Sequence, residues 1–138
     1  MAKTKTTKKY TLAELMPSAT RELPVVHPKL GDLGFSITVR CHNASGVRRK
    51  ALEAALTAQV AVRESKLIDK VDRLLEAENL AAETAAASVV GWPDDCAFGI
   101  YTPEACLALM KREGGDWLRA LVNSYASVEG NFFQSVGD

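Results

Sequence analysis

The sequence predicts a mainly α-helical fold of the α+β class, with a small N-terminal β-hairpin, one long helix and two shorter C-terminal helices. Three patterns lead to this prediction. Apolar and polar residues alternate from Phe35 to Cys41, which is typical of a strand with one buried face. Good helix formers run almost without interruption from Val47 to Val90. Glycine and proline signals then divide the remaining chain into two short helices.

Length and charge indicate one domain preceded by a basic arm. The chain has 138 residues, of which 47% are hydrophobic and 25% charged, as expected for a globular domain with a single core. Its formal net charge is zero, yet Lys3, Lys5, Lys8 and Lys9 all stand at the start. We therefore expect a flexible basic arm over residues 1–22. Residues 23–138 should form a single, mostly helical domain with a β element at about 25–41.

The β-hairpin is expected from two neighbouring stretches. Val25 and Val26 supply one strand, and the alternating segment from Phe35 to Cys41 supplies the other, with Gly31 and Gly34 in the turn between them. A single hairpin is marginally stable in water. It must therefore pack on the helices or pair with another chain.

The long helical stretch conflicts with a compact domain. A continuous helix from Val47 to Val90, capped by Ser45, would be about 65 Å long, whereas the expected radius of gyration is about 14 Å. The helix must break or protrude, and the sequence favours a break near Asn79, before an alanine-rich run. The alternative is a protruding helix whose apolar stripe is covered by a second copy. That stripe omits one turn around Arg63 and Glu64, and it contains Leu52, Leu56, Val60, Leu67, Val71, Leu74 and Leu75.

The C-terminal helices are marked by local signals. Gly91-Trp92-Pro93 ends the long helix, and Thr102 is a good N-cap for the next one. That short helix stops at Gly114-Gly115, and Asp116 is predicted to cap a last helix running from 117 towards 132. Its predicted apolar face consists of Trp117, Leu121, Tyr125, Val128 and Phe132.

No catalytic, metal or cofactor site is predicted. Adjacent Asp94 and Asp95 are interpreted as a solvated loop, and no nucleophile elbow or phosphate-binding loop is present. Cys41-His42 could offer two metal ligands, but no second pair completes a site. The widely spaced cysteines, which include Cys96 and Cys106, argue against a disulfide framework and predict free, mostly buried thiols. We expect a non-enzymatic protein without cofactors.

Charge and hydropathy also limit the partners. No apolar run approaches the roughly 20 residues of a membrane-spanning helix, and the basic start lacks the apolar run of a secretory signal. A cytosolic chain without a membrane partner is expected. The arm lysines could contact nucleic-acid phosphates, but the rest of the chain is acidic on balance, so a solubilising arm or one that orders on a protein is favoured. A second basic spot, 48–50, opposes the helix dipole and is compatible with a solvated face or with an acidic docking surface.

The stretch from Val89 to Phe133 carries an ordered set of motifs. These are a valine pair, Gly-Trp, an acidic turn, an aromatic residue, Thr-x-Glu opening a helix, Trp-Leu opening the last helix and a closing Asn-Phe. The matching residues are Val89, Val90, Gly91, Trp92, Phe98, Tyr101, Thr102, Glu104, Leu109, Trp117, Leu118, Asn131 and Phe132. This order resembles the tail assembly chaperones of long-tailed bacteriophages, and His27-Pro28, Gly31 and the strand FSITV are similar to their opening segment. The Lys/Thr-rich arm is outside the pattern.

The resemblance implies a late, non-enzymatic protein of virion assembly that acts in the host cytoplasm and is absent from the mature virion. It would bind the tape-measure protein, help to recruit tail-tube subunits and form homo-oligomers. The candidate partner-binding residues are Leu67, Val71, Trp92, Phe98, Trp117, Tyr125, Phe132 and Phe133. Two alternatives remain: a structural virion component, such as a head-tail joining or minor tail protein, and a small DNA-associated regulatory protein that uses the basic arm.

Overall fold

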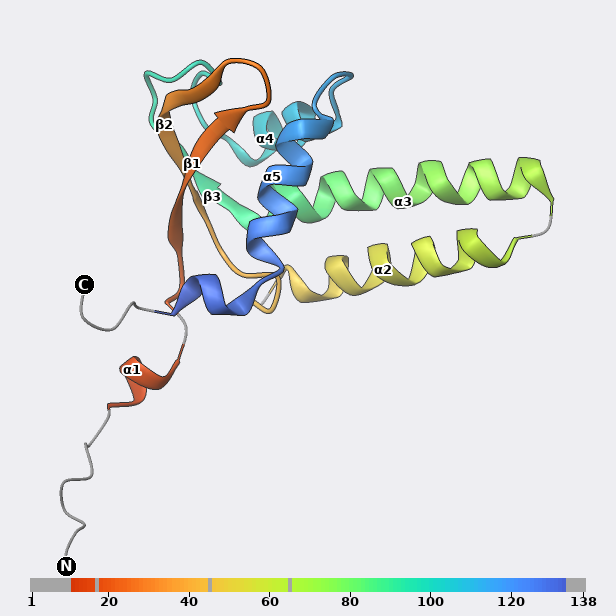
Figure 1. The fold of residues 1–138 in the computed structure, drawn as a ribbon, viewed down its shortest axis with the longest axis horizontal. Helices are drawn as coiled ribbons and strands as arrows, with labels where there is room; N and C mark the ends of the chain where they lie inside the picture. Colours follow the sequence, from red (N-terminus) through yellow and green to blue (C-terminus); the bar gives the residue numbers. More distant parts are fainter. Residues whose placement is uncertain (1–10, 17, 45, 65, 134–138) are drawn as a thin grey trace, which may run out of the picture.

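The fold is a small body of sheet and helices from which a long helical hairpin projects (Figure 1). The computed structural model describes residues 11–16, 18–44, 46–64 and 66–133, so the arm residues 1–10 and the predicted cap Ser45 lie outside the described residues. The elements in chain order are α1 (Leu12–Leu15), β1 (Arg21–His27), β2 (Gly31–Val39), α2 (Arg48–Arg63), α3 (Leu67–Ser88), β3 (Val89–Gly91), α4 (Pro103–Lys111), α5 (Asp116–Ala126) and a 3-10 helix (Glu129–Phe132). The predicted fold class, mostly helical with a small N-terminal sheet, is confirmed.

The predicted β-hairpin is present and is longer than expected. β1 and β2 pair antiparallel from Arg21 opposite Val39 to His27 opposite Gly31, with a register shift between Pro24 and Val26. The strand therefore begins two residues before the predicted domain boundary at residue 23. Gly31 has a φ of +77°, a conformation that glycine adopts without the steric cost of a side chain.

A third strand was missed by the sequence analysis, which assigned Val89 and Val90 to the long helix. In the structure these residues open β3, which pairs antiparallel with β2 through Val39 opposite Val89 and Thr38 opposite Gly91. The sheet order is β1-β2-β3. Strand pairing overrides the helical pattern here because it buries Val89, which is 3% exposed, and because β-branched residues fit a pleated surface well.

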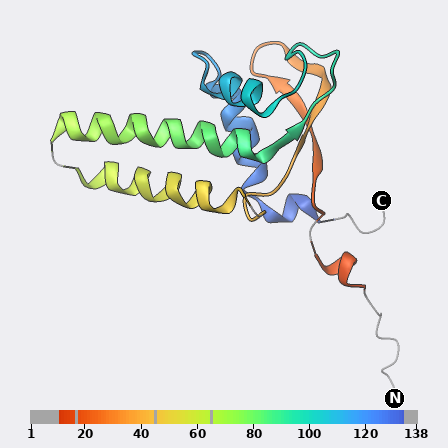
Figure 2. The same ribbon diagram turned by 180° about the vertical axis from the view of Figure 1, so that it is seen from behind.

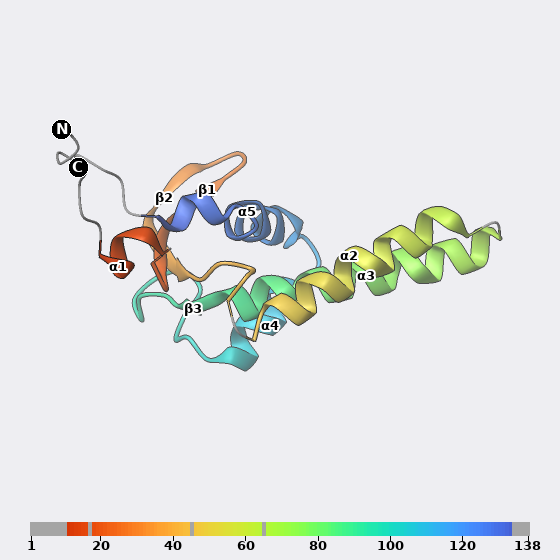
Figure 3. The same cartoon turned by 90° about the horizontal axis from the view of Figure 1, so that it is seen from below.

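The predicted break near Asn79 was wrong. Asn79 lies inside α3, and α2 ends at Arg63, with the backbone of Glu64 extended. The break lies at Arg63 and Glu64, in the one helical turn where the apolar stripe is interrupted. These charged residues can remain in water there. The long stretch therefore folds back on itself, and the resulting antiparallel hairpin also projects from the body (Figures 1 and 3).

The two C-terminal helices follow the predicted signals with two corrections. Thr102 caps α4, since its Oγ1 accepts a hydrogen bond from the Ala105 N–H at 2.9 Å. The prediction that Asp116 caps the last helix was wrong, because Gly115 holds the N-cap position and the Asp116 carboxylate instead accepts from Arg119 at 2.6 Å. α5 also ends at Ala126 rather than continuing towards residue 132.

One core joins the sheet to α4, α5 and the end of α3. Seen from behind, α4 lies beside the end of α3, next to β3 (Figure 2). The largest fully buried side chains include Val25, Ile37, Val39, Met110, Leu118, Val122 and Phe132. The cysteines are free, with Cys41 and Cys106 buried and Cys96 partly buried, as predicted. Burial raises the pKa of Cys106 to about 12, so its thiol stays protonated at neutral pH.

An aromatic cluster closes the loop between β3 and α4. Trp92 donates its indole N–H to the Gly99 carbonyl at 2.7 Å. Its ring also makes edge-to-face contacts with Phe98 and Tyr101, with centroid distances of 5.3 Å and 4.9 Å. Phe98 in turn contacts Phe35 of β2 at 5.1 Å. Edge-to-face contacts of this kind add to the hydrophobic stabilisation of the buried rings.

Removal of the central ring should therefore destabilise the body. We expect Trp92→Ala to lower the free energy of unfolding by about 3–5 kcal/mol, measured by chemical denaturation followed by circular dichroism. The matched control is Ile100→Ala in the same loop, where the side chain is 71% exposed and the expected change is within about 0.5 kcal/mol. Equal effects of the two substitutions would contradict a core role for Trp92.

Candidate protein-binding surfaces

A group of exposed aliphatic side chains covers the projecting helices. These side chains are between 42% and 78% exposed, although residues of this size are usually buried. We call them the hairpin surface: Leu52, Leu56, Val60 and Val62 of α2, and Leu67, Ile68, Val71, Leu74 and Leu75 of α3. Single exposed aliphatic residues are common, but a concentration of them on one element is typical of a protein-binding site.

The hairpin has little core of its own. Of the described residues of α2, Ala61 alone is buried, and the buried residues of α3 begin only at Ala82. α2 and α3 pack against each other, and helices in proteins draw most of their stability from such packing. The outer half of the hairpin relies on this one contact, and its large aliphatic side chains remain open to a partner that would cover them.

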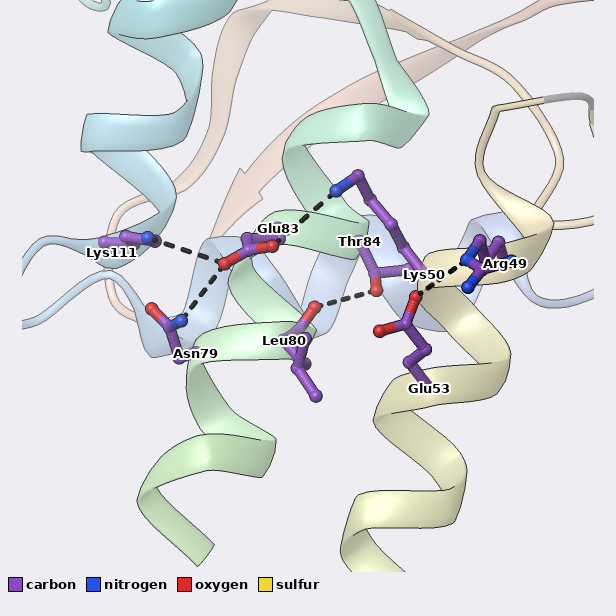
Figure 4. A network of polar contacts seen from close by, with 8 residues as sticks. All are labelled: Arg49, Lys50, Glu53, Asn79, Leu80, Glu83, Thr84 and Lys111. Atoms are coloured by element: carbon purple, nitrogen blue, oxygen red, sulfur yellow. Dashed lines mark hydrogen bonds and ion pairs between the residues drawn. The ribbon is translucent and has the colours of Figure 1, made fainter. Parts of the chain in front are cut away.

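A polar network fixes the base of the hairpin (Figure 4). The Glu83 carboxylate of α3 lies 3.6 Å from the Lys50 ammonium of α2 and 3.7 Å from that of Lys111 in α4. It also accepts a hydrogen bond from the Asn79 amide at 3.1 Å. One carboxylate thus links three helices at the base of the hairpin. Lys50, part of the predicted basic spot, is engaged by this acidic residue of its own chain.

A second contact joins the hairpin to α5. The Nε2 of His42 lies 3.1 Å from Asn123 Oδ1, and the Asn123 amide donates to the Ala81 carbonyl of α3 at 3.1 Å. Because the amide of Asn123 is used as a donor there, its oxygen accepts from His42, which places a hydrogen on Nε2. Burial lowers the pKa of His42 below its usual 6.5, and the hydrogen bond with Asn123 partly opposes this shift.

The structure separates the predicted binding residues into different places. Leu67 and Val71 lie on the hairpin surface. Trp117 and Tyr125 lie together on α5, beside Leu23 and Val26 of β1, in a shallow groove with a volume of about 500 Å³. The rings of Trp117 and His27 also meet in an edge-to-face arrangement, with their centroids 4.8 Å apart.

Phe133 belongs to a third surface. It is partly buried and lines a groove of about 550 Å³ with Leu15 and Met16 beside α1. The Phe133 carbonyl also accepts a hydrogen bond from Arg21 at 2.6 Å. The end of the described chain is therefore tied to the start of β1.

Two of the predicted residues belong to the core, and a third packs against it. Trp92 is 8% exposed and Phe132 is fully buried, so neither side chain can contact a partner without a change of fold. Phe98 is partly buried within the Trp92 cluster. Their prediction as contact residues followed from their bulk and position in the motif, but bulk alone does not distinguish a core ring from an exposed one.

Part of the hairpin surface was not predicted from the sequence. Val62 and Ile68 flank the turn between α2 and α3 and are 75% and 71% exposed. The signal was the omitted turn in the apolar stripe, which marked the point where the helix reverses. Once the helix is folded there, these two residues stand at the tip of the hairpin.

Elsewhere, the described residues offer no metal cluster and no membrane-spanning helix. Within residues 11–133, apart from positions 17, 45 and 65, no group of three His, Cys, Asp or Glu side chains is arranged to hold a metal ion. Asp94 and Asp95 are exposed, as predicted for a solvated loop. In the same part of the chain no helix combines the length and the apolar character needed to cross a bilayer.

Comparison of the chain with protein-family models, with curated proteins and with solved structures finds no match. The surfaces described above and the sequence motifs are therefore the basis for a functional proposal.

The weak core of the hairpin should be visible in amide hydrogen exchange. Local opening requires less free energy where few side chains are buried, so amides in 52–60 and 68–78 should exchange faster than those in 82–88. Mass spectrometry of peptides after exchange would measure this difference. Uniform protection along α3 would contradict a hairpin that lacks its own core.

The burial of His42 should make stability depend on pH. Because its pKa is lowered in the folded state, the unfolded chain takes up the proton first as the pH falls below about 6.5. This contribution to stability is present above that pH and is lost as the pH falls towards the lowered pKa. A decrease in pH from about 7.5 to about 5.5 should therefore lower the Tm of the wild-type chain more than that of His42→Gln. Thermal unfolding at each pH would measure the two Tm values. An equal or greater decrease in the variant would exclude this role.

Proposed function

We propose that this chain is a bacteriophage tail assembly chaperone, a non-enzymatic protein that binds the tape-measure protein and helps to recruit tail-tube subunits. The resemblance from Val89 to Phe133 suggests the family. The observation that supports binding is the hairpin surface, which exposes nine large aliphatic side chains on one projecting element. In this proposal the protein acts in the host cytoplasm and does not remain in the mature virion.

The hairpin surface suits a helical and partly apolar client. A long tape-measure protein with an exposed apolar stripe would aggregate before the tail tube surrounds it. A client helix laid along α2 or α3 would bury both apolar surfaces, which is a common mode of helix recognition. Since these side chains are already about half covered, each would contribute on the order of 1 kcal/mol, before the entropic cost of association. Several copies along a client would add these contributions.

The α5–β1 groove offers a separate place for a second protein. It is formed on the body by Trp117, Leu121 and Tyr125 together with Leu23 and Val26, whereas the hairpin projects away from the body (Figure 3). A client on the hairpin would thus leave the groove accessible. This separation supports a role in which one chain holds a tape-measure protein and meets a tube subunit.

Charge substitutions on the hairpin surface should abolish client binding without unfolding the body. We expect Leu67→Glu combined with Val71→Glu to remove most of the tape-measure protein from the soluble fraction on co-expression, because buried carboxylates would disrupt the apolar contact. The matched control is Leu30→Glu, at a similarly exposed leucine in the β1–β2 turn. Circular dichroism would establish that both variants are folded. Full solubilisation by the double variant would contradict the hairpin as the client site.

A tagged pull-down from cells that produce the particle separates this function from the alternatives. Recovery of tape-measure and tail-tube proteins, with this chain missing from purified virions, is the expected result. A fixed number of copies in virions would instead identify a structural component. Steeply salt-dependent binding to duplex DNA, with no recovery of tail proteins, would favour a DNA-associated regulator.

A further inference from the structure

The basic arm and the outer half of α3 have complementary character. Among the first sixteen residues are four lysines and one glutamate, and the exposed side chains at the end of this segment are the apolar Leu12, Leu15 and Met16. The segment 67–78 of α3 carries four acidic and two basic residues among the five aliphatic side chains of the hairpin surface. One segment is thus basic and apolar, and the other is acidic and apolar.

The carboxylates of α3 are available for a basic partner. Glu76 is paired with Arg73 of the same helix at 3.2 Å. Within the part of the chain that the structure describes, no ion pair engages Asp69, Asp72 or Glu78. These carboxylates stand on the same helix segment as the exposed aliphatic side chains of the hairpin surface.

α1 and the outer half of α3 lie on opposite sides of the molecule. Both the view in Figure 1 and the view from below in Figure 3 place α1 on the side of the body away from the α2–α3 turn. Ten residues precede Thr11 and can span at most about 33–36 Å when extended, and α3 with its 22 residues is about 33 Å long. The arm is therefore long enough to lie along α3 of a neighbouring copy.

We propose that the arm and α1 of one copy dock on the α3 part of the hairpin surface of another copy. The lysines would approach Asp69, Asp72 and Glu78, while Leu12, Leu15 and Met16 would cover aliphatic side chains of α3. Because α1 and the acceptor lie on opposite sides of each copy, the contact is head-to-tail and continues from copy to copy, forming an open chain or a closed ring. The partner here is a second copy, so this contact goes beyond the proposed client binding and does not require it.

Sedimentation velocity of the purified full-length chain tests this contact. The mass should rise above the 14.9 kDa of one copy as concentration increases at low salt. It should return towards one copy at about 1 M salt, where charges are screened beyond about 3 Å. A wild-type chain that remains monomeric at every concentration would overturn the proposal, whether the arm is free, docks on its own hairpin or serves only a client.

Charge reversal gives a sharper test. One variant changes Lys3, Lys5, Lys8 and Lys9 to Glu, and a second combines Asp72→Lys with Glu78→Lys. Each alone should weaken self-association by about tenfold or more. An equimolar mixture should recover it, because the acidic arm of one variant faces the basic helix of the other, and the unchanged arm and helix also match.

The control is Asp95→Lys combined with Glu113→Lys, which makes the same charge change at exposed positions of the body and should leave self-association unchanged. Failure of the mixture to recover association, or an equal effect of the control, would refute the contact. No phage protein takes part in these measurements. Their outcome is therefore independent of the pull-down that tests the proposed function.

Discussion

The close packing at the C-terminal end of α3 is the constraint on which the rest of the structure depends. Small residues there, Ala82, Ala85 and Ser88, are buried and let α4, α5 and the sheet approach the helix closely. The hydroxyl of Ser88 donates to the Thr84 carbonyl at 2.8 Å, so burial leaves this polar group satisfied. Arg40 then bonds the last carbonyls of the helix, from its N–H to Ser88 and from its Nε to Ala87, both at 2.8 Å. These contacts supply the partners that a helix end otherwise lacks.

The same arrangement explains why the hairpin is exposed. The buried core lies where the sheet, α4 and α5 meet the last turns of α3, whereas the large aliphatic side chains on the outer turns of α2 and α3 remain exposed. Glu83 links the base of the hairpin to α4 through Lys50 and Lys111 but adds little stability, because partly exposed ion pairs are worth about 0–1 kcal/mol. The body therefore contains most of the buried core, and the hairpin presents most of the exposed aliphatic surface described above.

Charge is balanced over the whole chain but separated along it. α2 carries four basic residues and one acidic residue, whereas α3 carries five acidic and two basic residues. The lysines of the arm add a third charged segment. A zero net charge thus conceals segments of opposite sign. Attraction between such segments would weaken as salt is added, because exposed charges are screened beyond about 10 Å at 0.1 M salt. Formal net charge is a poor guide to the partners of such a chain.

Local signals in the sequence determined much of this protein. The alternation from Phe35 to Cys41, the cap at Thr102 and the apolar stripe of the long helix all follow from neighbouring residues and were predicted. Tertiary structure decided what depends on distant residues. It decided that Val89 pairs with Val39, that the helix reverses at Glu64, and that Trp92 is buried while Leu67 is exposed. The reason is physical, because periodicity shows which residues share a face, whereas only packing determines whether another element covers that face.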